Sequence, residues 1–318
     1  MRFVEVLGHE NAIRDLRNAL RLGRVHSAYL FVGPVGVGRQ TLMRAFAAAL
    51  LCHAGGTDAC GRCASCRLLA SDRHPDLRVL ETEEETVSVD RTREFCRILS
   101  LRAVESARCV GLVPDADLMT AQAANSFLKT LEEPPGPAVL LLRSEGTDRL
   151  LKTIVSRSQV VRLAPLPFEA VKEALVARQA ASGDEAAALA RLAEGSLGRA
   201  LALASGKAGK DWTWLQGALQ GLRPGGALAL ADGLVERAAG SSRAGMRLRA
   251  QTLLDMTALF FRQEMRERKG VLPRDVLACI EAVWRASERL AANVNPELSL
   301  QTLALDLAAS FPAGAVSP

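Results

Sequence analysis

Short apolar runs alternate with longer amphipathic segments through the first half of the chain. An apolar run of roughly 4–8 residues that ends at a turn predicts a buried strand. Helical segments between such runs predict right-handed crossovers and a mostly parallel sheet. The predicted strands are residues 28–32, 76–80, 109–113, 138–142 and 159–163, and a helix is expected over 41–51.

The strand pattern stops after residues 165–167, and the rest of the chain is rich in alanine and leucine at helical spacing. Two breaks, at 182–184 and 195–198, divide the helical segments up to about residue 205. Residues 205–210 are small, polar and contain glycine, which is typical of a linker. Farther on, one helical face carries an apolar stripe that predicts a core-facing surface. Its members are Met246, Leu253, Met256 and Phe260.

These patterns predict a chain that is α/β at first and then all-α, in three parts. Residues 1–164 are expected to form an α/β domain with a cysteine-rich module inserted near 52–66. Residues 165–205 are expected to form a small helical domain, and residues 206–318 a helical C-terminal domain.

The composition agrees with a largely helical core. Apolar residues make up 49% of the chain and aromatic residues only 4%, so alanine and leucine must supply most of the buried surface. The 40 basic and 35 acidic residues nearly cancel, which leaves a net charge of +5. A balance this mild permits contact with DNA phosphates without requiring it.

Targeting signals are not evident in the sequence. No apolar run approaches the roughly 18–20 residues of a membrane helix, and the first residues lack the pattern of a signal peptide. These features predict a cytoplasmic protein whose thiols are reduced.

A glycine-rich loop follows the first predicted strand and precedes the predicted helix. Its glycines are Gly33, Gly36 and Gly38. In this context backbone N–H groups and a helix N-terminus can bind phosphate, with a lysine reaching the phosphates and a hydroxyl holding Mg²⁺. Here Arg39 and Gln40 occupy those two places, and Thr41 comes one position late. We therefore expect the backbone shape without the full ATP-binding chemistry, and a turn that holds no ligand is the alternative.

A P-loop ATPase also needs acidic residues at the end of a neighbouring strand, where they hold Mg²⁺ and position water. Pro114 stands where the first acid is expected, and Asp115 stands where a longer glutamate is expected. The loss of both Mg²⁺-holding groups predicts that this chain does not hydrolyse ATP on its own. The alternative is that Asp115 and Asp117 only cap the following helix.

Four of the seven cysteines crowd into one short segment with the spacing C-x7-C-x2-C-x2-C. They are Cys52, Cys60, Cys63 and Cys66. Four thiolates at this spacing predict a tetrahedral Zn²⁺ site, and a site with four protein ligands is structural because it leaves no position for water. His53 is a competing ligand, but its adjacency to Cys52 makes joint coordination awkward. The other cysteines, predicted to be core residues, are Cys96, Cys109 and Cys279.

Two later segments carry the most specific pattern. Residues 123–135 read AANSFLKTLEEPP and residues 150–159 read LLKTIVSRSQ. Both closely resemble signatures of the bacterial clamp-loader subunits of DNA polymerase III, an AAA+ family, although Ser158 replaces the family's cysteine. Three other segments resemble the family's opening pattern and lid domain, namely 8–10, 24–31 and 195–201.

The resemblance implies an AAA+ P-loop domain followed by a lid domain and a C-terminal collar. Gamma/tau subunits of this family have intact ATP sites, whereas delta-prime subunits often have degraded ones. The departures at Arg39, Gln40 and Pro114 therefore favour the delta-prime type.

The resemblance also implies roles for single residues. Arg157 matches the family's arginine finger, which would act in trans on a nucleotide bound to a neighbouring subunit. On sequence position alone, the favoured interpretation of Arg157 is an exposed arginine in a surface ion pair. Ser144 matches the polar residue that senses γ-phosphate, and Arg199 matches the lid arginine. In a degraded site the favoured alternative is that both are packing remnants without these roles. The four cysteines match a zinc module that this family inserts after the first P-loop helix.

The function that the resemblance implies is that of a delta-prime subunit. Such a chain would join gamma/tau and delta subunits in the complex that loads the sliding clamp onto primed DNA during replication. Two alternatives stay open. One is a gamma/tau-type subunit that hydrolyses ATP, and the other is a zinc-containing DNA-binding protein on an inactive AAA+ scaffold.

Overall fold

The computed structural model describes residues 1–82, 86–205, 208–223, 225–239, 243–267, 274–292 and 294–310. The chain divides into two compact units. The first consists of residues 1–171 together with 194–199, and the second of residues 172–193 together with the chain from residue 200 onward. The predicted division of the second half into a lid and a collar stays a prediction.

The first unit is built on a parallel sheet in the order β2-β3-β4-β1-β5. Its strands are β1 (Ala28–Val32), β2 (Leu77–Val79), β3 (Val110–Val113), β4 (Val139–Ser144) and β5 (Gln159–Arg162). All five lie where the apolar runs predict them, and the parallel sheet is confirmed. In the register of the central strands, Ala28 pairs with Leu140 on β4 and Tyr29 with Gln159 on β5.

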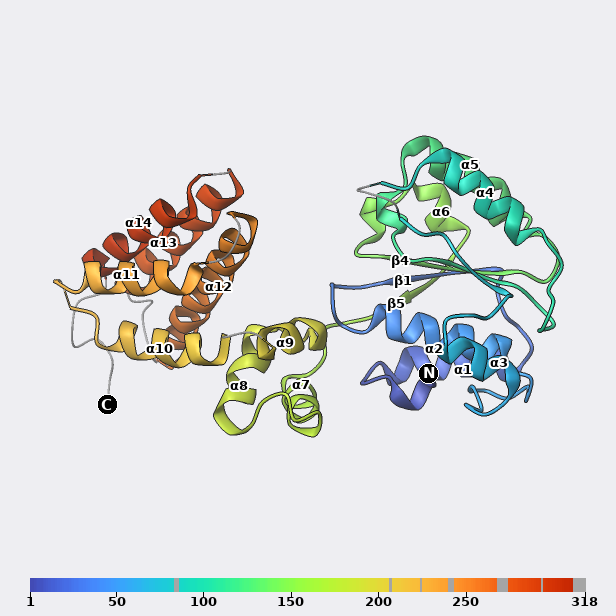
Figure 1. Cartoon of the computed structure of the whole chain (residues 1–318), viewed down its shortest axis with the longest axis horizontal. Helices are drawn as coiled ribbons and strands as arrows, with labels where there is room; N and C mark the ends of the chain where they lie inside the picture. Colours follow the sequence, from blue (N-terminus) through green and yellow to red (C-terminus); the bar gives the residue numbers. More distant parts are fainter. Residues whose placement is uncertain are drawn as a thin grey trace. The chain divides into compact units, whose positions relative to one another are not determined.

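Helices cover both faces of the sheet (Figure 1). The alternation along β1 explains how, because Tyr29 and Phe31 pack on one face while Leu30 and Val32 pack on the other. The first face is covered by α1 (Glu10–Arg21) and α2 (Arg39–Leu51). The second is covered by α4 (Val89–Leu99), α5 (Ala121–Glu132) and α6 (Lys152–Ser156). A strand buried on both faces is apolar throughout, which is why these runs do not alternate with polar residues.

Local sequence fixes where the helices of the second face begin. Thr120 caps α5 by accepting a hydrogen bond from the Ala123 N–H at 3.2 Å. Ser88 caps α4 through the Arg91 N–H at 3.4 Å. Caps of this kind stabilise a helix by about 0.5–2 kcal/mol. The remaining elements of this unit are η1 (Phe3–Glu5), α3 (Ala64–Ala70), η2 (Ala116–Leu118) and η3 (Thr147–Arg149).

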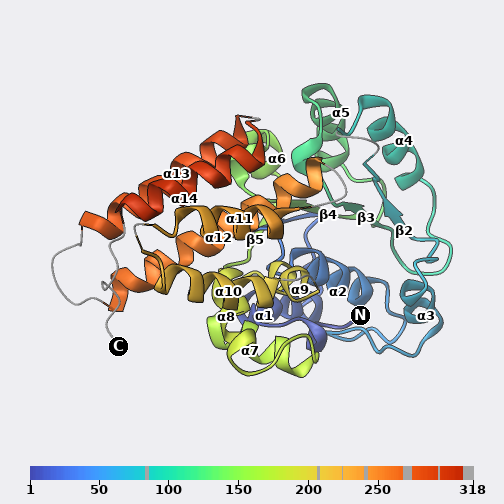
Figure 2. The ribbon, with the colours of Figure 1, turned by 60° about the vertical axis from the view of Figure 1, so that its left-hand side comes forward.

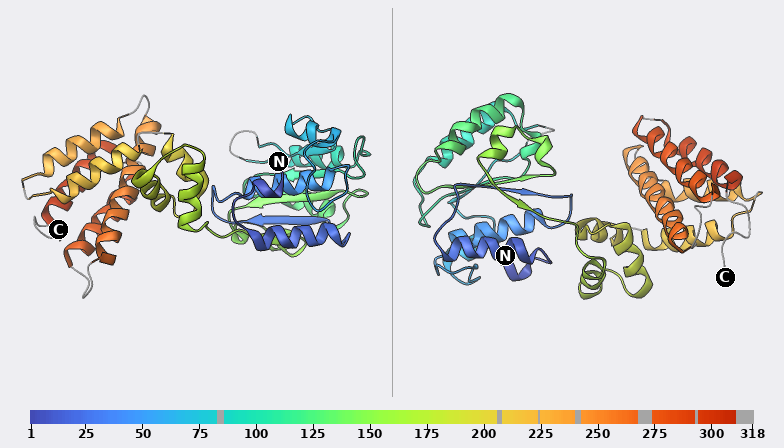
Figure 3. Two further views of the ribbon diagram at one scale, coloured as in Figure 1. Left: turned by 90° about the horizontal axis from the view of Figure 1, so that it is seen from below. Right: turned by 180° about the vertical axis from the view of Figure 1, so that it is seen from behind.

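Every element described after β5 is a helix, which confirms the predicted change from α/β to all-α. They are α7 (Phe168–Ala177), α8 (Gly183–Leu192), α9 (Leu197–Ala204), α10 (Ala208–Gln220), α11 (Ala227–Ala238), α12 (Arg243–Glu267), α13 (Arg274–Ala291) and α14 (Pro296–Ser310). In the second unit α14 packs against α11 and α13, and α12 packs against α13 (Figure 2). Figure 3 gives two further views of the sheet and of these helices.

The predicted apolar stripe on α12 is confirmed in part. Leu253, Met256 and Phe260 are buried, whereas Met246 is only half-buried. The prediction of a linker over residues 205–210 is wrong for its last three residues, because α10 begins at Ala208. Gly209 lies so close to α8 that a Cβ there would stand 2.0 Å from Glu185 Oε1, so this glycine serves helix packing. Residues 206 and 207 lie outside the described residues.

Across the part of the chain that the structure describes, no helix combines the length and the apolar character needed to cross a membrane.

Candidate functional site: a self-occupied phosphate loop, an exposed arginine and a cysteine cluster

The phosphate loop has the backbone shape that its glycines predict. It connects β1 to α2, and Gly36 and Gly38 have φ angles of +78° and +111°. Only glycine adopts these conformations without strain. Gly38 is the N-cap of α2, so the loop ends at a helix N-terminus. The backbone is therefore suited to an anion.

The chain itself lies against this loop. The Gly198 N–H donates to the Gly36 carbonyl at 2.9 Å. A Cβ on Gly36 would stand 2.2 Å from Ser196 Oγ, so the two segments touch. On the other side, the His9 Nε2–H donates to the Val37 carbonyl at 2.8 Å. The side chain of Arg199, the predicted lid arginine, is exposed. Two carbonyls of the loop, those of Gly36 and Val37, thus accept hydrogen bonds from other parts of the chain.

The two substituted loop residues do not reproduce lysine and hydroxyl chemistry. Arg39 is 7% exposed, and among the described residues no hydrogen bond from its guanidinium is found. Burial lowers the pKa of Arg39, and the nearby Arg143 lowers it further. An arginine remains charged even so. The Oε1 atom of Gln40 is buried and has no hydrogen-bond partner, and Thr41 is half-buried.

The carboxylate of Asp115, the acidic residue near the loop, forms an ion pair with an arginine of the same chain. Arg143 Nη2 lies 2.6 Å from Asp115 Oδ1, and Thr82 Oγ1 donates to Asp115 Oδ2 at 2.9 Å. Arg143 Nε also donates to the Pro114 carbonyl at 2.5 Å. Both oxygens of the carboxylate that would serve a metal ion are therefore engaged by side chains.

The alternative in which both aspartates cap the following helix is wrong. Asp115 is the N-cap residue of η2, but its side chain makes no capping hydrogen bond because it is paired with Arg143. Asp117 accepts hydrogen bonds from Ser144 Oγ and from the Glu145 N–H, the latter at 2.8 Å. Ser144, the predicted γ-phosphate sensor, is buried and its hydroxyl is engaged by Asp117.

Sequence reasoning missed Arg143 and His9 as parts of this site. Arg143 comes directly after the apolar run at 138–142, and a basic residue at the end of a buried strand is a signal that could have found it. His9 belongs to the opening pattern at residues 8–10, but nothing in that pattern indicates contact with the loop. Arg39 and Arg143 thus lie in a partly buried group of charges with Asp115, Asp117 and Glu145.

Arg157, the predicted arginine finger, is the C-cap residue of α6. Its side chain is 36% exposed, and its Nη2 forms an ion pair of 2.5 Å with Glu132 Oε1 at the end of α5. Its Nη1 donates to the Thr153 carbonyl at 3.1 Å. The guanidinium is thus held at the surface by α5 and α6, and the surface ion pair considered from the sequence is present.

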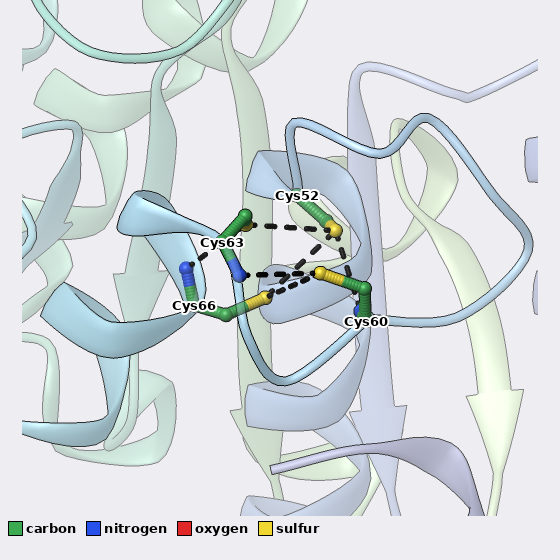
Figure 4. A group of neighbouring side chains, drawn as sticks. All are labelled: Cys52, Cys60, Cys63 and Cys66. Carbon is green, nitrogen blue, oxygen red and sulfur yellow. Dashed lines mark hydrogen bonds between the residues drawn. The ribbon is translucent and has the colours of Figure 1, made fainter.

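The four predicted metal ligands lie together (Figure 4). Their Sγ atoms are all within 4.8 Å of one another, with separations of 3.8 Å for Cys52–Cys66 and 4.0 Å for both Cys52–Cys63 and Cys60–Cys66. A tetrahedral zinc ion with Zn–S bonds near 2.3 Å places its sulfurs about 3.8 Å apart. The residues present therefore fit a metal ion of this kind.

Local structure holds these sulfurs in place. Cys52 follows the last residue of α2, and Cys63 is the N-cap of α3, where its Sγ accepts the Cys66 N–H at 3.4 Å. The backbone N–H groups of Arg62 and Cys63 lower the pKa of Cys60 to about 6, whereas burial raises the pKa of Cys66 to about 12. A cation at the centre would favour the thiolate in all four.

The remaining candidates lie apart from the cluster. His53 Nε2 contacts the Glu105 carbonyl at 3.0 Å and is not among the grouped ligands. Cys109 and Cys279 are buried, as predicted for core residues, while Cys96 is only half-buried.

Comparison with known proteins shows which family this chain belongs to. The family model described as DNA polymerase III, delta subunit, matches residues 8–167. A DNA polymerase III subunit delta' from Pseudomonas aeruginosa is 44% identical over 154 residues, which cover 48% of this chain and 47% of the relative. The subunit delta' from Escherichia coli is 38% identical over 187 residues, covering 58% and 56%.

Other similar proteins are named as tau or gamma subunits of DNA polymerase III. A DNA polymerase III subunit tau from Escherichia coli is 34% identical over 245 residues, covering 74% of this chain and 38% of the relative. A solved DNA polymerase III gamma subunit-related protein from Thermotoga maritima aligns over 93% of this chain and 99% of its own, at 19% identity and a TM-score of 0.45.

The matched regions span about half the length of the delta' relatives. The family model nevertheless covers the whole parallel sheet, the phosphate loop, the cysteine cluster and Arg157. The chain belongs to the DNA polymerase III delta' subunit family.

Proposed function

We propose that this chain works as a delta-prime subunit of a clamp loader. It does not hydrolyse ATP with its own loop, and it supplies Arg157 to a nucleotide held by a neighbouring gamma/tau subunit. Together with gamma/tau and delta subunits it loads the sliding clamp onto primed DNA. The observation that supports this most strongly is the pairing of Asp115 with Arg143 at 2.6 Å.

The physical reason is competition for the carboxylate. A P-loop ATPase needs its acid to hold Mg²⁺ and to position the attacking water. In this chain a guanidinium and the Thr82 hydroxyl take both oxygens of Asp115, and Gln40 offers no hydroxyl to the metal. The loop keeps its shape as a structural connection while its catalytic chemistry is lost.

Arg157, in contrast, is suited to act on a nucleotide that is bound to a neighbouring subunit. An arginine supplied in trans stabilises charge on the transferred phosphoryl group and can raise the rate about 10³–10⁵-fold. An exposed ion pair such as that with Glu132 contributes only about 0–1 kcal/mol, so a phosphate group can replace the carboxylate at little cost.

We further propose that the cysteine cluster binds zinc and that this site is structural. Four protein thiolates complete the tetrahedron and leave no position for water or substrate. Replacement of Cys63 by serine should reduce the bound zinc from about one ion per chain to almost none. Elemental analysis checks this, with Cys96→Ser as the control because Cys96 lies outside the cluster. Wild-type protein prepared without chelators and found free of metal would contradict the zinc site.

Reconstitution tests the proposed function. This chain should co-purify with gamma/tau and delta subunits, and a loader assembled without it should load clamps poorly. The isolated chain should show no ATP turnover. Tight ATP binding with hydrolysis by the isolated chain would favour a gamma/tau-type enzyme. Tight, salt-sensitive binding of DNA by the isolated chain would favour a DNA-binding protein.

A further inference from the structure

A buried hydrogen-bond network lies beside the cysteine cluster, and no cysteine side chain takes part in it. Ser65 and Asp76 are fully buried and His74 is 4% exposed. Neither the phosphate loop nor Arg157 uses these groups. Polar groups are buried at a cost unless they are hydrogen-bonded, so a network of this kind requires an explanation.

His74 connects the two sides of the network. Its Nδ1 accepts the Asp76 N–H at 3.1 Å, so the ring hydrogen must be on Nε2. That Nε2–H points to Ser65 Oγ at 2.9 Å, with Ser106 Oγ farther away at 3.4 Å. Burial lowers the pKa of His74, in agreement with the neutral ring that this arrangement needs.

The two hydroxyls meet at one carbonyl next to the cluster. Ser65 Oγ donates to the Leu51 carbonyl at 2.7 Å, and Ser106 Oγ donates to the same oxygen at 3.0 Å. Leu51 directly precedes Cys52, and Ser65 lies between Cys63 and Cys66. The network therefore fixes both chain segments that carry these three sulfurs.

Asp76 extends the network to a loop that precedes β3. Its carboxylate accepts the N–H groups of Val104 at 2.7 Å, Glu105 at 2.8 Å and Ser106 at 2.7 Å. Burial alone would raise the pKa of Asp76, but the three N–H donors outweigh it and the pKa is lowered. Residues 104–106 are thus tied to the same centre as the cysteines.

We propose that His74 is the positioning residue of the metal centre. Through Ser65 and the Leu51 carbonyl it holds the segments of Cys52, Cys63 and Cys66 at metal-binding distance. Through the Asp76 N–H it couples the centre to residues 104–106. The proposal rests on the metal site and does not depend on the clamp-loader role.

The first test measures zinc affinity of the full chain by competition with a chromophoric chelator. His74→Phe keeps the ring shape and removes the hydrogen bonds, so it should weaken zinc binding about 10–100-fold, as loss of supporting contacts does at other metal sites. Ser65→Ala should also weaken zinc binding. This variant replaces His74→Phe in the test if His74→Phe does not fold. His26→Ala is the control, because His26 is exposed and lies outside the network. Wild-type affinity in both network variants would overturn the proposal.

The second test uses hydrogen exchange on the wild-type chain. Removal of zinc should speed exchange of the Val104, Glu105 and Ser106 amides by roughly tenfold or more, and leave that of the central strand β1 unchanged. Unchanged exchange at residues 104–106 would overturn the coupling. A wild-type chain that binds no zinc would overturn the proposal and the metal site together, without bearing on the clamp-loader role.

Discussion

At the scale of single residues, several independent changes set this loop apart from a P-loop that binds ATP and Mg²⁺. Arg39 and Gln40 replace the phosphate-binding lysine and the metal-binding hydroxyl, and Arg143 takes the carboxylate of Asp115. The first two changes are visible in the sequence, because the motif fixes the positions to compare. The sequence offers a basic residue at Arg143 but not its partner, since Asp115 follows the neighbouring strand β3 and lies 28 residues away in the chain.

The Arg143–Asp115 ion pair leads to a prediction about variants in which the P-loop motif is restored. The double variant Arg39→Lys with Gln40→Thr restores the motif, yet it should still not hydrolyse ATP because Asp115 remains paired with Arg143. Addition of Arg143→Ala should make Mg²⁺-dependent binding of labelled ATP measurably tighter than in the double variant. Turnover by the double variant at rates typical of an ATPase would show that the Asp115 pairing is not what disables the site.

Glu132 offers a second prediction at this scale. Because its carboxylate competes with phosphate for Arg157, Glu132→Gln should leave clamp-stimulated ATP turnover of the reconstituted loader at or above the wild-type level. Since the ion pair is exposed, the free energy of unfolding should fall by no more than about 1 kcal/mol. Glu133→Gln is the matched control from the next position. A loss of turnover in Glu132→Gln alone would mean that the carboxylate is needed to aim the guanidinium.

At the scale of elements, the apolar runs predict all five strands, with ends that differ by at most two residues. The central strands β1, β3 and β4 give a strong signal because both of their faces are covered. The beginnings of α8, α9 and α10 are less predictable, since Gly183, Leu197 and Ala208 start helices inside segments expected to be breaks or a linker. Glycine and serine are tolerated at a helix start, and packing between helices decides the boundary.

The contact between the phosphate loop and residues 196–198 can be tested at this scale. Gly36→Ala adds a Cβ 2.2 Å from Ser196 Oγ at a positive φ, and it should lower the free energy of unfolding by about 1–3 kcal/mol. Gly136→Ala is the control, because Gly136 has a φ of +61° but no atom within 4 Å of the added Cβ. Chemical denaturation of both variants gives the comparison. Equal losses would mean that the cost is backbone strain alone and that the segment does not press on the loop.

At the scale of the whole molecule, the chain combines a unit with a parallel sheet and a unit made of helices. The sequence predicts this change of class because the strand pattern ends at residues 165–167. The segment that the family model matches lies in the first unit, and so do the four clustered cysteines and Arg157. The family model ends at residue 167, so the collar role expected for the helices after residue 205 stays a prediction.

The central claim is that this chain contributes a cationic side chain to the nucleotide of a neighbour while its own loop stays inactive. The most direct measurement is single-turnover ATP hydrolysis by the loader reconstituted with Arg157→Ala, in the presence of clamp and primed DNA. Arg149→Ala serves as the control, since Arg149 is also exposed and also forms an ion pair, with Glu145 at 2.8 Å. We expect normal assembly of both variants and, for Arg157→Ala alone, a fall of about 10³-fold or more in hydrolysis at the adjoining site. Hydrolysis at the wild-type rate at every site of a fully assembled Arg157→Ala loader would contradict it.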